Sequence, residues 1–473
     1  MGALLIGSLA LDAFHRLEEL MDDRKNAVLR FWELWRKNPW IRAAAASIPT
    51  VGPGLVQLMS ADDRKVLLTR FDELTADLKV EVLEGMKALE RNNRPNAIPI
   101  LAIGSGNEEH VLITPSGLEV VLGQKHPVDE AAERYGGSCV NYSLRLLSYG
   151  VPVLPIVSIG NDKMGRCIQQ QLISTAQECC PSEPVLEFLQ SDAFFTPGVN
   201  TPHTTVLVHG PHRTIFSQKP DRSEFFTKTL ERRLESAEHL MNGPPSAVLL
   251  GHIYGDQPSD GQSGCGEPSE CTRLIVERYT GRSCVIVNFG QTQIERGAAS
   301  WQSMLAGVDV LQLNLGEMRR FLAGGGQRRT LKQIIEWLAE RSVTAVVTLD
   351  RLGALGTYKD GKEHGTVFAW SLITSDDVRD PTGAGDAFAA GMASQLRGKS
   401  APTFFDFREA IGVGRLWAAY ACTTVAGPRA YPTPELLADF AKTIADTRGF
   451  HPVEELHGHR SEEILDLFDM AYQ

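Results

Sequence analysis

The stretch Asp380-Pro-Thr-Gly-Ala-Gly-Asp-Ala-Phe388 is the most informative part of this sequence. It follows the strand-like residues 372–374 and leads into an apolar helical pattern over residues 387–396. Small residues let a ligand approach the backbone closely, and consecutive N–H groups at the start of a helix attract an anion. The stretch therefore predicts a strand, a tight turn and a helix that bind a phosphate group. Asp386 would lie in the first helical turn, where a general base toward an attacking hydroxyl group is its most reasonable role.

This turn is neither of the two common phosphate loops. The sequence contains no G-x-x-x-x-G-K-[ST] stretch, and G-x-G-x-x-G is absent from this region. Taken alone, a glycine-rich turn between a strand and a helix is equally compatible with a structural role. Its interpretation therefore depends on the rest of the chain.

Around this turn, short apolar strands alternate with amphipathic helices from residue 98 onward. The strand-like segments are residues 98–103, 153–159, 247–250, 284–287, 308–313 and 344–349. This alternation predicts a largely parallel sheet covered by helices. Two other segments, 111–122 and 204–218, alternate apolar and polar residues, as strands with one face in water do. We expect them to form a small accessory sheet that acts as a lid.

Four further motifs precede the turn in chain order: Gly136-Gly-Ser-Cys-Val-Asn141, Gly160-Asn-Asp162 with Gly165, Asn314-Leu-Gly-Glu317, and Thr348 to Gly353. With these motifs, residues 98 to 440 resemble the ribokinase-like PfkB family of carbohydrate and nucleoside kinases. The resemblance implies a three-layer α/β/α core with a small β-sheet lid. It also implies an ATP-dependent phosphotransferase that moves the γ-phosphoryl group to a primary hydroxyl of a sugar or nucleoside, with Asp386 as general base.

The resemblance also assigns roles to individual residues. The N–H groups of Gly383, Ala384 and Gly385 would stabilise charge on the transferring group. Substrate hydroxyls would meet Asn107, Glu109, Gly136, Gly137 and Asn141. Thr348 and Gly353 would bind the nucleotide. Asn314 and Glu317 would hold Mg²⁺ directly or through water. Asp380 would either organise a loop for a monovalent cation such as K⁺ or cap the turn.

Two departures from the family pattern leave a second interpretation open. Glu109 stands where the family has a substrate-binding Asp, and Asp350 stands where the nucleotide loop usually has its first glycine. An acidic side chain at position 350 would repel phosphate. The alternative is a catalytically weak or inactive ribokinase-like protein that binds a ligand and regulates through its N-terminal helices.

The acceptor is only weakly indicated, and both a sugar and a nucleoside remain open. A phosphorylated acceptor would need basic residues over its phosphate, and Lys125, Arg134 and Arg145 are available. Charged residues in such places are more often solvated surface groups, and we expect that role for these three.

Composition divides the chain near residue 95. Residues 1–95 contain 14 Lys or Arg, 14 Asp or Glu and only 5 of the 43 glycines, and their apolar residues recur at helical spacing. We predict an all-α module at 1–95 that serves docking, oligomerisation or signalling and could bind a protein partner. A kinase domain at 96–440 and a helical extension at 441–473 would follow.

The net charge of −11 gives no global attraction to nucleic acid. Eight scattered cysteines without metal spacing indicate reduced thiols and a cytoplasmic protein. The apolar run at 3–11 lacks the basic residues and cleavage site of a signal peptide, and no uninterrupted stretch is long enough to cross a bilayer. By resemblance, we expect a homo-oligomer.

Overall fold

The computed structural model describes residues 98–115, 123–209, 212–218, 222, 224–253, 270–323, 329–360, 363–424, 431–448, 453–456 and 465. The chain divides into two units, Met1–Ala97 and Ile98–Gln473. The helical module predicted for residues 1–95 lies outside the described residues.

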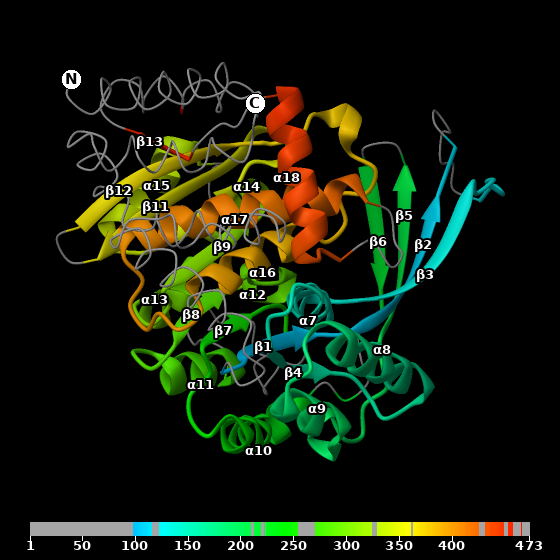
Figure 1. Ribbon diagram of the computed structural model, residues 1–473. Helices are drawn as coiled ribbons and strands as arrows, with labels where there is room; N and C mark the ends of the chain where they lie inside the picture. Colours follow the sequence, from blue (N-terminus) through cyan, green and yellow to red (C-terminus); the bar gives the residue numbers. More distant parts are fainter. Residues whose placement is uncertain are drawn as a thin grey trace, which may run out of the picture. The chain divides into compact units, whose positions relative to one another are not determined.

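A nine-stranded sheet forms the centre of the second unit (Figure 1). Six strands run parallel in the order β10-β9-β8-β7-β1-β4, and an antiparallel β11-β12-β13 edge follows β10. Their bounds are β1 Ile100–Ser105, β4 Val153–Ser158, β7 Ala247–Leu250, β8 Cys284–Val287, β9 Val310–Asn314, β10 Ala345–Thr348, β11 Gly353–Asp360, β12 Glu363–Trp370 and β13 Glu454–Glu455. The parallel strands are almost entirely buried, which explains their continuous apolar sequences.

Helices cover both faces of this sheet. From β1 the chain crosses through α7 to the edge strand β4, and it then returns in the opposite direction through β7, β8, β9 and β10. Because such crossovers are right-handed, α7 lies on one face and the helices that connect β7 to β10 lie on the other, while α8 packs beside α7. α16 packs against both α7 and α17, so these three helices share a face (Figure 1). The three-layer fold class expected from the sequence is confirmed.

The helix bounds are α7 Ser138–Ser148, α8 Lys163–Cys179, α9 Glu183–Gln190, α10 Glu224–Met241, α11 Glu270–Tyr279, α12 Gln291–Glu295, α13 Gln302–Leu305, α14 Leu315–Ala323, α15 Leu331–Glu340, α16 Ala384–Leu396, α17 Phe404–Thr423 and α18 Pro434–Arg448. Glycines allow α16 and α17 to approach each other closely. A Cβ atom at Gly391 would lie only 3.0 Å from the Cα of Gly414. Among the described residues, no helix is both long and apolar enough for a membrane span.

The lid is a separate four-stranded sheet in the order β3-β2-β5-β6, with β2 Asn107–Ile113, β3 Glu130–Gly136, β5 His203–His209 and β6 His212–Ser217. Val111, Val206 and Val208 form its small apolar core. β5 and β6 occupy the second predicted lid segment. The first segment overlaps β2, which begins four residues earlier than expected, while residues 116–122 lie outside the described residues. β3 was not anticipated, because its sequence lacks strand-like alternation.

The strand predicted at residues 372–374 is wrong. β12 ends at Trp370, and the hydroxyl of Ser371 donates a 2.8 Å hydrogen bond to the carbonyl of Ile373 in a local turn. Leu372 and Ile373 are apolar because they pack against α17 and α18, beside Ala419 and Ile444. Burial against helices gives the same short apolar pattern as burial in a sheet.

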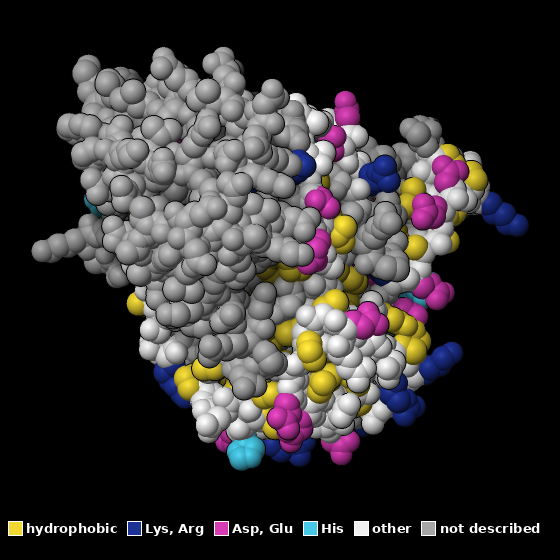
Figure 2. Space-filling view, viewed as in Figure 1, with side chains coloured by type: hydrophobic (Ala, Val, Ile, Leu, Met, Phe, Trp, Pro, Cys, Tyr) yellow, Lys and Arg dark blue, Asp and Glu magenta, His cyan; other side chains and the backbone are white. Residues whose placement is uncertain are grey.

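The end of the chain combines both kinds of element. α18 runs across the expected boundary between residues 440 and 441, and β13 pairs with β12 through Val367 and Phe368. Figure 2 shows acidic and basic side chains interspersed over the visible described surface, with apolar side chains exposed over the lid. The most exposed of these apolar groups on the lid strands are Ile215 and Phe216 of β6.

Candidate active site

The start of α16 has the backbone geometry of an anion-binding turn. Gly383 is the N-cap residue and has a left-handed conformation with φ of 76°, which favours glycine. A Cβ atom there would lie 2.9 Å from Nη2 of Arg145, whereas at Gly385 no atom lies closer than 4.0 Å. The side of the turn at Gly385 is therefore open, whereas the N–H of Ala384 donates a 3.2 Å hydrogen bond to the carbonyl of Pro381 within the turn. Asp386 is the third residue of this helix.

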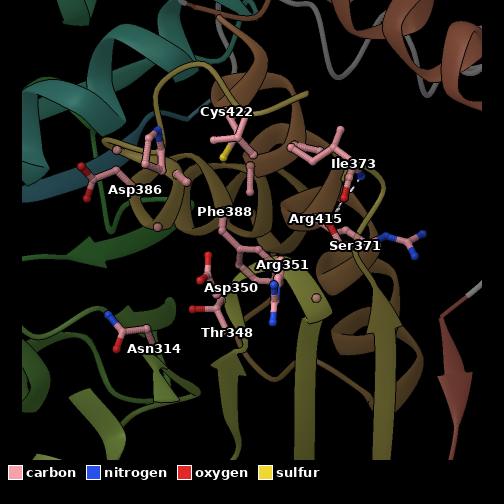
Figure 3. A pocket seen from close by; sticks show the side chains of 18 of the residues that line it. Asn314, Thr348, Asp350, Arg351, Ser371, Ile373, Asp386, Phe388, Arg415 and Cys422 are labelled. Carbon is pink, nitrogen blue, oxygen red and sulfur yellow. Dashed lines mark hydrogen bonds between the residues drawn. The ribbon is translucent and has the colours of Figure 1, made fainter. Parts of the chain in front are cut away.

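A cavity of about 570 Å³ lies below this turn. Its walls come from α16, from the carboxyl ends of β9 and β10, and from α17. Figure 3 shows Thr348, Asp350 and Asn314 on the strand side, with Phe388 and Asp386 of α16 across the cavity. This volume is in the usual range for a small-molecule site. The described chain thus places the predicted anion turn, nucleotide residues and metal residues around one cavity.

Asn141 connects the first glycine motif to the helix start. Its Nδ2 atom donates a 2.7 Å hydrogen bond to Oδ2 of Asp386. The chain can turn into α7 at this point because Gly137 has φ of 89°, and a Cβ atom there would lie 2.7 Å from the carbonyl oxygen of Ser105. Asp386 is therefore held in one orientation from the neighbouring helix.

The base of the lid carries the predicted substrate residues. Nδ2 of Asn107 donates a 2.6 Å hydrogen bond to Oγ1 of Thr204 on the next strand. The Oδ1 atom of Asn107 is buried and has no hydrogen-bond partner among the described residues. Gly136 lies against the Glu109 carboxylate so closely that a Cβ atom would collide with it. An unpaired buried acceptor is costly unless a ligand supplies a donor.

Arg134 of β3 bridges two acidic groups at this base. Its Nε atom lies 2.7 Å from Oε2 of Glu109, and its Nη1 atom lies 2.8 Å from Oδ2 of Asp380. Burial by itself would lower the pKa of the Arg134 guanidinium, but the charges of Glu109 and Asp380 outweigh burial and raise it. Arg134 is thus a partly buried ion-pair partner, and the expectation of a solvated surface group is wrong for it.

The hydrogen bonds of Asp380 match the role of capping the turn, which was the alternative to a role in binding K⁺. Its Oδ1 atom accepts a 2.9 Å hydrogen bond from the N–H of Thr382, while Oδ2 pairs with Arg134. A guanidinium at that distance disfavours a cation on the same carboxylate. The role of Asp380 in binding K⁺ stays a prediction.

Arg145 is also buried, with only 5% of its surface exposed, so the surface prediction is wrong for this residue as well. It lies over the Tyr431 ring, and its Nη1 atom donates to the carbonyl of Asn141 at 3.2 Å. Burial, opposed by the nearby charge of Asp386, lowers the pKa of Arg145. Lys125, the third basic candidate, is exposed as expected.

The nucleotide-side loop contains Asp350, one of the two departures from the family pattern. Gly353 has φ of 121°, and a Cβ atom there would collide with the carbonyl of Ala369. Asp350 also has a positive φ, of 51°, which favours glycine. The position where the family has glycine therefore keeps a glycine-like backbone with an acidic side chain, and that side chain lines the cavity beside Thr348.

Asn314 and Glu317 form a reciprocal pair at the start of α14. Oε2 of Glu317 accepts from the N–H of Asn314 at 2.9 Å, and Oδ1 of Asn314 accepts from the N–H of Glu317 at 2.8 Å. Both residues line the cavity. Because carboxylate and amide oxygens suit Mg²⁺, this pair fits an ion held through water.

Two cavity residues were missed by sequence reasoning. Gln312 is almost fully buried in β9, and its Nε2 atom donates to the carbonyl of Gly385 at 3.3 Å. Asn288 donates from Nδ2 to the carbonyl of Gln312 at 3.1 Å. The available signal was a glutamine inside the apolar strand sequence of β9, because a polar residue in such a strand needs a specific partner.

Comparison with known proteins is consistent with this geometry. Residues 282–431, which include the turn, the Asn314–Glu317 pair and the nucleotide-side loop, match the pfkB family carbohydrate kinase model. The chain carries a ribokinase-like PfkB domain. The resemblance inferred from the motifs is thereby confirmed. No curated protein sequence matches the chain.

The fold of the PfkB domain is also that of solved ribokinases. Ribokinase from Thermotoga maritima is 18% identical, with a TM-score of 0.50, and the match covers 73% of this chain and 99% of that chain. Ribokinase from Giardia lamblia is 16% identical, with a TM-score of 0.53 and the same coverage. Arabidopsis thaliana ribokinase, solved with ribose and ATP, is 16% identical, with a TM-score of 0.50 and again the same coverage. At these identities the likeness shows the fold.

Proposed function

We propose that this protein is an ATP-dependent phosphotransferase that moves the γ-phosphoryl group to a primary hydroxyl of a sugar or nucleoside. The observation that carries this proposal is the 2.7 Å hydrogen bond from Asn141 to Asp386 in the first turn of α16. This hydrogen bond holds the Asp386 carboxylate between the proposed anion-binding turn and the polar base of the lid. This is where a base must lie to deprotonate a hydroxyl that attacks a phosphate.

In the proposed reaction, Asp386 accepts the proton of the acceptor hydroxyl as the hydroxyl oxygen attacks the γ-phosphorus of ATP. The bond from the γ-phosphorus to the bridging oxygen breaks, and ADP leaves. A positioned base contributes about 10²–10⁴-fold to a rate. The N–H groups of Gly383 and Gly385 stabilise the charge of the transferring group, and the N–H of Ala384 does so while shared with the carbonyl of Pro381. One such donor is typically worth about 2.7–4 kcal/mol. Mg²⁺, held by Asn314 and Glu317 through water, would neutralise phosphate charge.

The acceptor would bind at the base of the lid. The buried Oδ1 atom of Asn107 needs a donor, and a substrate hydroxyl is a suitable one. Gly136 and Gly137 have no room for a side chain, because Cβ atoms there would meet the Glu109 carboxylate and the Ser105 carbonyl, so these glycines let the lid residues pack closely at this point. The nucleotide would occupy the cavity beside Thr348 and Gly353. The Arabidopsis ribokinase, which shares this fold, was solved with ribose and ATP.

The decisive experiment is ADP release by the purified chain with ATP and Mg²⁺ against a panel of sugars, sugar phosphates and nucleosides. We expect release that depends on one acceptor class and falls at least about 10²-fold in Asp386→Asn, with nucleotide binding retained. Asp376→Asn is the matched control, because Asp376 is an exposed aspartate ten residues away. Equal activity of the two variants would contradict the role of Asp386.

A second candidate function has a specific observation in its favour. Glu109 is engaged by Arg134 at 2.7 Å, so the carboxylate that would take two sugar hydroxyls already has a partner. A ribokinase-like protein that binds ligand without turnover would regulate through residues 1–95. Nucleotide binding without ADP release across the whole panel would support this alternative. A cytoplasmic location, a homo-oligomeric state and a protein partner for residues 1–95 stay predictions.

A further inference from the structure

The outer face of the lid carries a cluster of metal-ligating side chains that the proposed reaction does not use. Glu108 and His110 alternate along β2 with Asn107 and Glu109, so they point away from the substrate residues. His203 of β5 lies directly opposite Glu108 in the parallel register. The three residues therefore converge from two strands on one face.

The distances within this cluster are short. Nδ1 of His203 lies 3.0 Å from Oε2 of Glu108, and Nε2 of His110 lies 3.6 Å from the same oxygen. The two imidazole rings have their centroids 4.4 Å apart. One ligand atom from each residue lies within 4.8 Å of the others. All three side chains are partly exposed, so an ion can reach them from solvent.

These separations suit a transition-metal ion. Zinc bonds of about 2.0–2.2 Å in tetrahedral geometry place neighbouring ligand atoms about 3.4 Å apart. The 3.0 and 3.6 Å separations lie on either side of that value, and small side-chain rotations would bring all three atoms onto one ion. Two imidazoles with one carboxylate favour zinc or a similar ion over Mg²⁺ or Ca²⁺, which prefer oxygen ligands.

A fourth residue supplies outer support. Oε1 of Glu133 on β3 lies 3.7 Å from Nδ1 of His110, the ring nitrogen on the far side from Glu108. Metal-binding histidines commonly donate their second N–H to a carboxylate, which fixes the ring and its tautomer. Glu133 stands opposite His110 in the antiparallel register and is placed for this role.

We propose that Glu108, His110 and His203 bind one Zn²⁺ ion, with Glu133 orienting His110 and a coordination position left to water. Such an ion would join β2 to β5 at the residues that flank the Asn107–Thr204 hydrogen bond. It would therefore stiffen the base of the lid from its outer face. This proposal is independent of the catalytic proposal, because the site shares no ligand residue with the cavity.

The test is equilibrium dialysis of the full chain against Zn²⁺, with the bound metal counted by mass spectrometry. We expect His110→Ala/His203→Ala to bind one ion fewer than the parent chain. Glu133→Gln should retain the ion with affinity reduced about 10–100-fold, as is typical when an outer-shell partner is removed. His239→Ala is the control, because His239 is an exposed histidine in the last turn of α10.

The unfolding temperature with and without Zn²⁺ provides a second test, which remains valid if a variant is less stable. Ligand binding raises the unfolding temperature by mass action, so added Zn²⁺ should raise it in the parent chain and in His239→Ala. His203→Gln keeps a polar group beside Glu108 and should lose this zinc-dependent rise even if its metal-free unfolding temperature is unchanged. The proposal would be overturned if His110→Ala/His203→Ala bound as much zinc as the parent chain and His203→Gln showed the same zinc-dependent rise.

Discussion

Arg134 and Asp380, 246 positions apart in the chain, are joined by a 2.8 Å ion pair that ties lid strand β3 to the turn before α16. The same guanidinium holds Glu109, so one cation serves two buried carboxylates. The lid and the anion-binding turn are therefore positioned together. This connection is a property of the tertiary structure, because no local pattern relates these residues.

We expect Arg134→Gln to destabilise the fold by about 3–5 kcal/mol, because it leaves two acidic groups without their cation. The free energy of unfolding in urea measures this loss. Arg273→Gln provides the matched control, since Arg273 pairs with Glu277 on an exposed helix surface and should contribute at most about 0.5 kcal/mol. Similar losses in the two variants would show that the buried bridge has no special role.

Asn141→Ala should lower kcat about 10–100-fold with the fold intact. A hydrogen bond to a charged group is worth about 1.5–3 kcal/mol, and here it orients the proposed base Asp386. Steady-state kinetics with the acceptor found in the panel would measure the change. Asn161→Ala, at an exposed asparagine, should leave kcat unchanged. An unaltered kcat in Asn141→Ala would mean that Asp386 does not depend on this contact.

Asp350→Gly should strengthen nucleotide binding by several fold. Removing one negative charge near phosphate at the protein surface is worth about 1 kcal/mol, and the positive φ of 51° already suits glycine. Titration calorimetry with ATP measures the affinity. Ser342→Gly is the control, because Ser342 has a similar φ of 55° outside the cavity. If Asp350→Gly and Ser342→Gly changed the ATP affinity equally, the gain would not come from removing the negative charge of Asp350.

Asp162→Ala should cost about 1 kcal/mol at neutral pH, because Asp162 caps α8. Burial raises the pKa of this carboxyl, but hydrogen bonds from Gly165 and Thr201 outweigh burial and lower it. A folded pKa below the unfolded value gives stability that is present above about pH 3.9 and lost as the pH falls through the folded pKa. The difference between variant and parent should therefore shrink in urea titrations toward about pH 3.

Thr330→Ala supplies the comparison for this pH dependence. Thr330 caps α15 with a neutral hydroxyl that accepts from the N–H of Gln333. Its cost should stay constant over the same pH range. A pH-independent loss in Asp162→Ala would contradict the assigned direction of the pKa shift.

The sequence by itself determined the six parallel strands of the main sheet and the glycine-rich turn before α16, but not the antiparallel edge strands β11, β12 and β13. Strand segments such as 247–250 and 284–287 could be predicted to the residue, because buried parallel strands are continuous apolar runs bounded by polar residues. The Gly383–Asp386 turn could be predicted because its small residues and the start of the helix are adjacent in the sequence.

Only the tertiary structure decided which side chains meet. It paired Arg134 with Asp380, placed Arg145 in a buried position, brought Gln312 to Gly385, and gathered Glu108, His110 and His203 on the outer face of the lid. These contacts join residues from different elements, and burial of a charged group depends on partners that are distant in the chain. Periodicity reports which face of an element is apolar, whereas packing sets what that face touches.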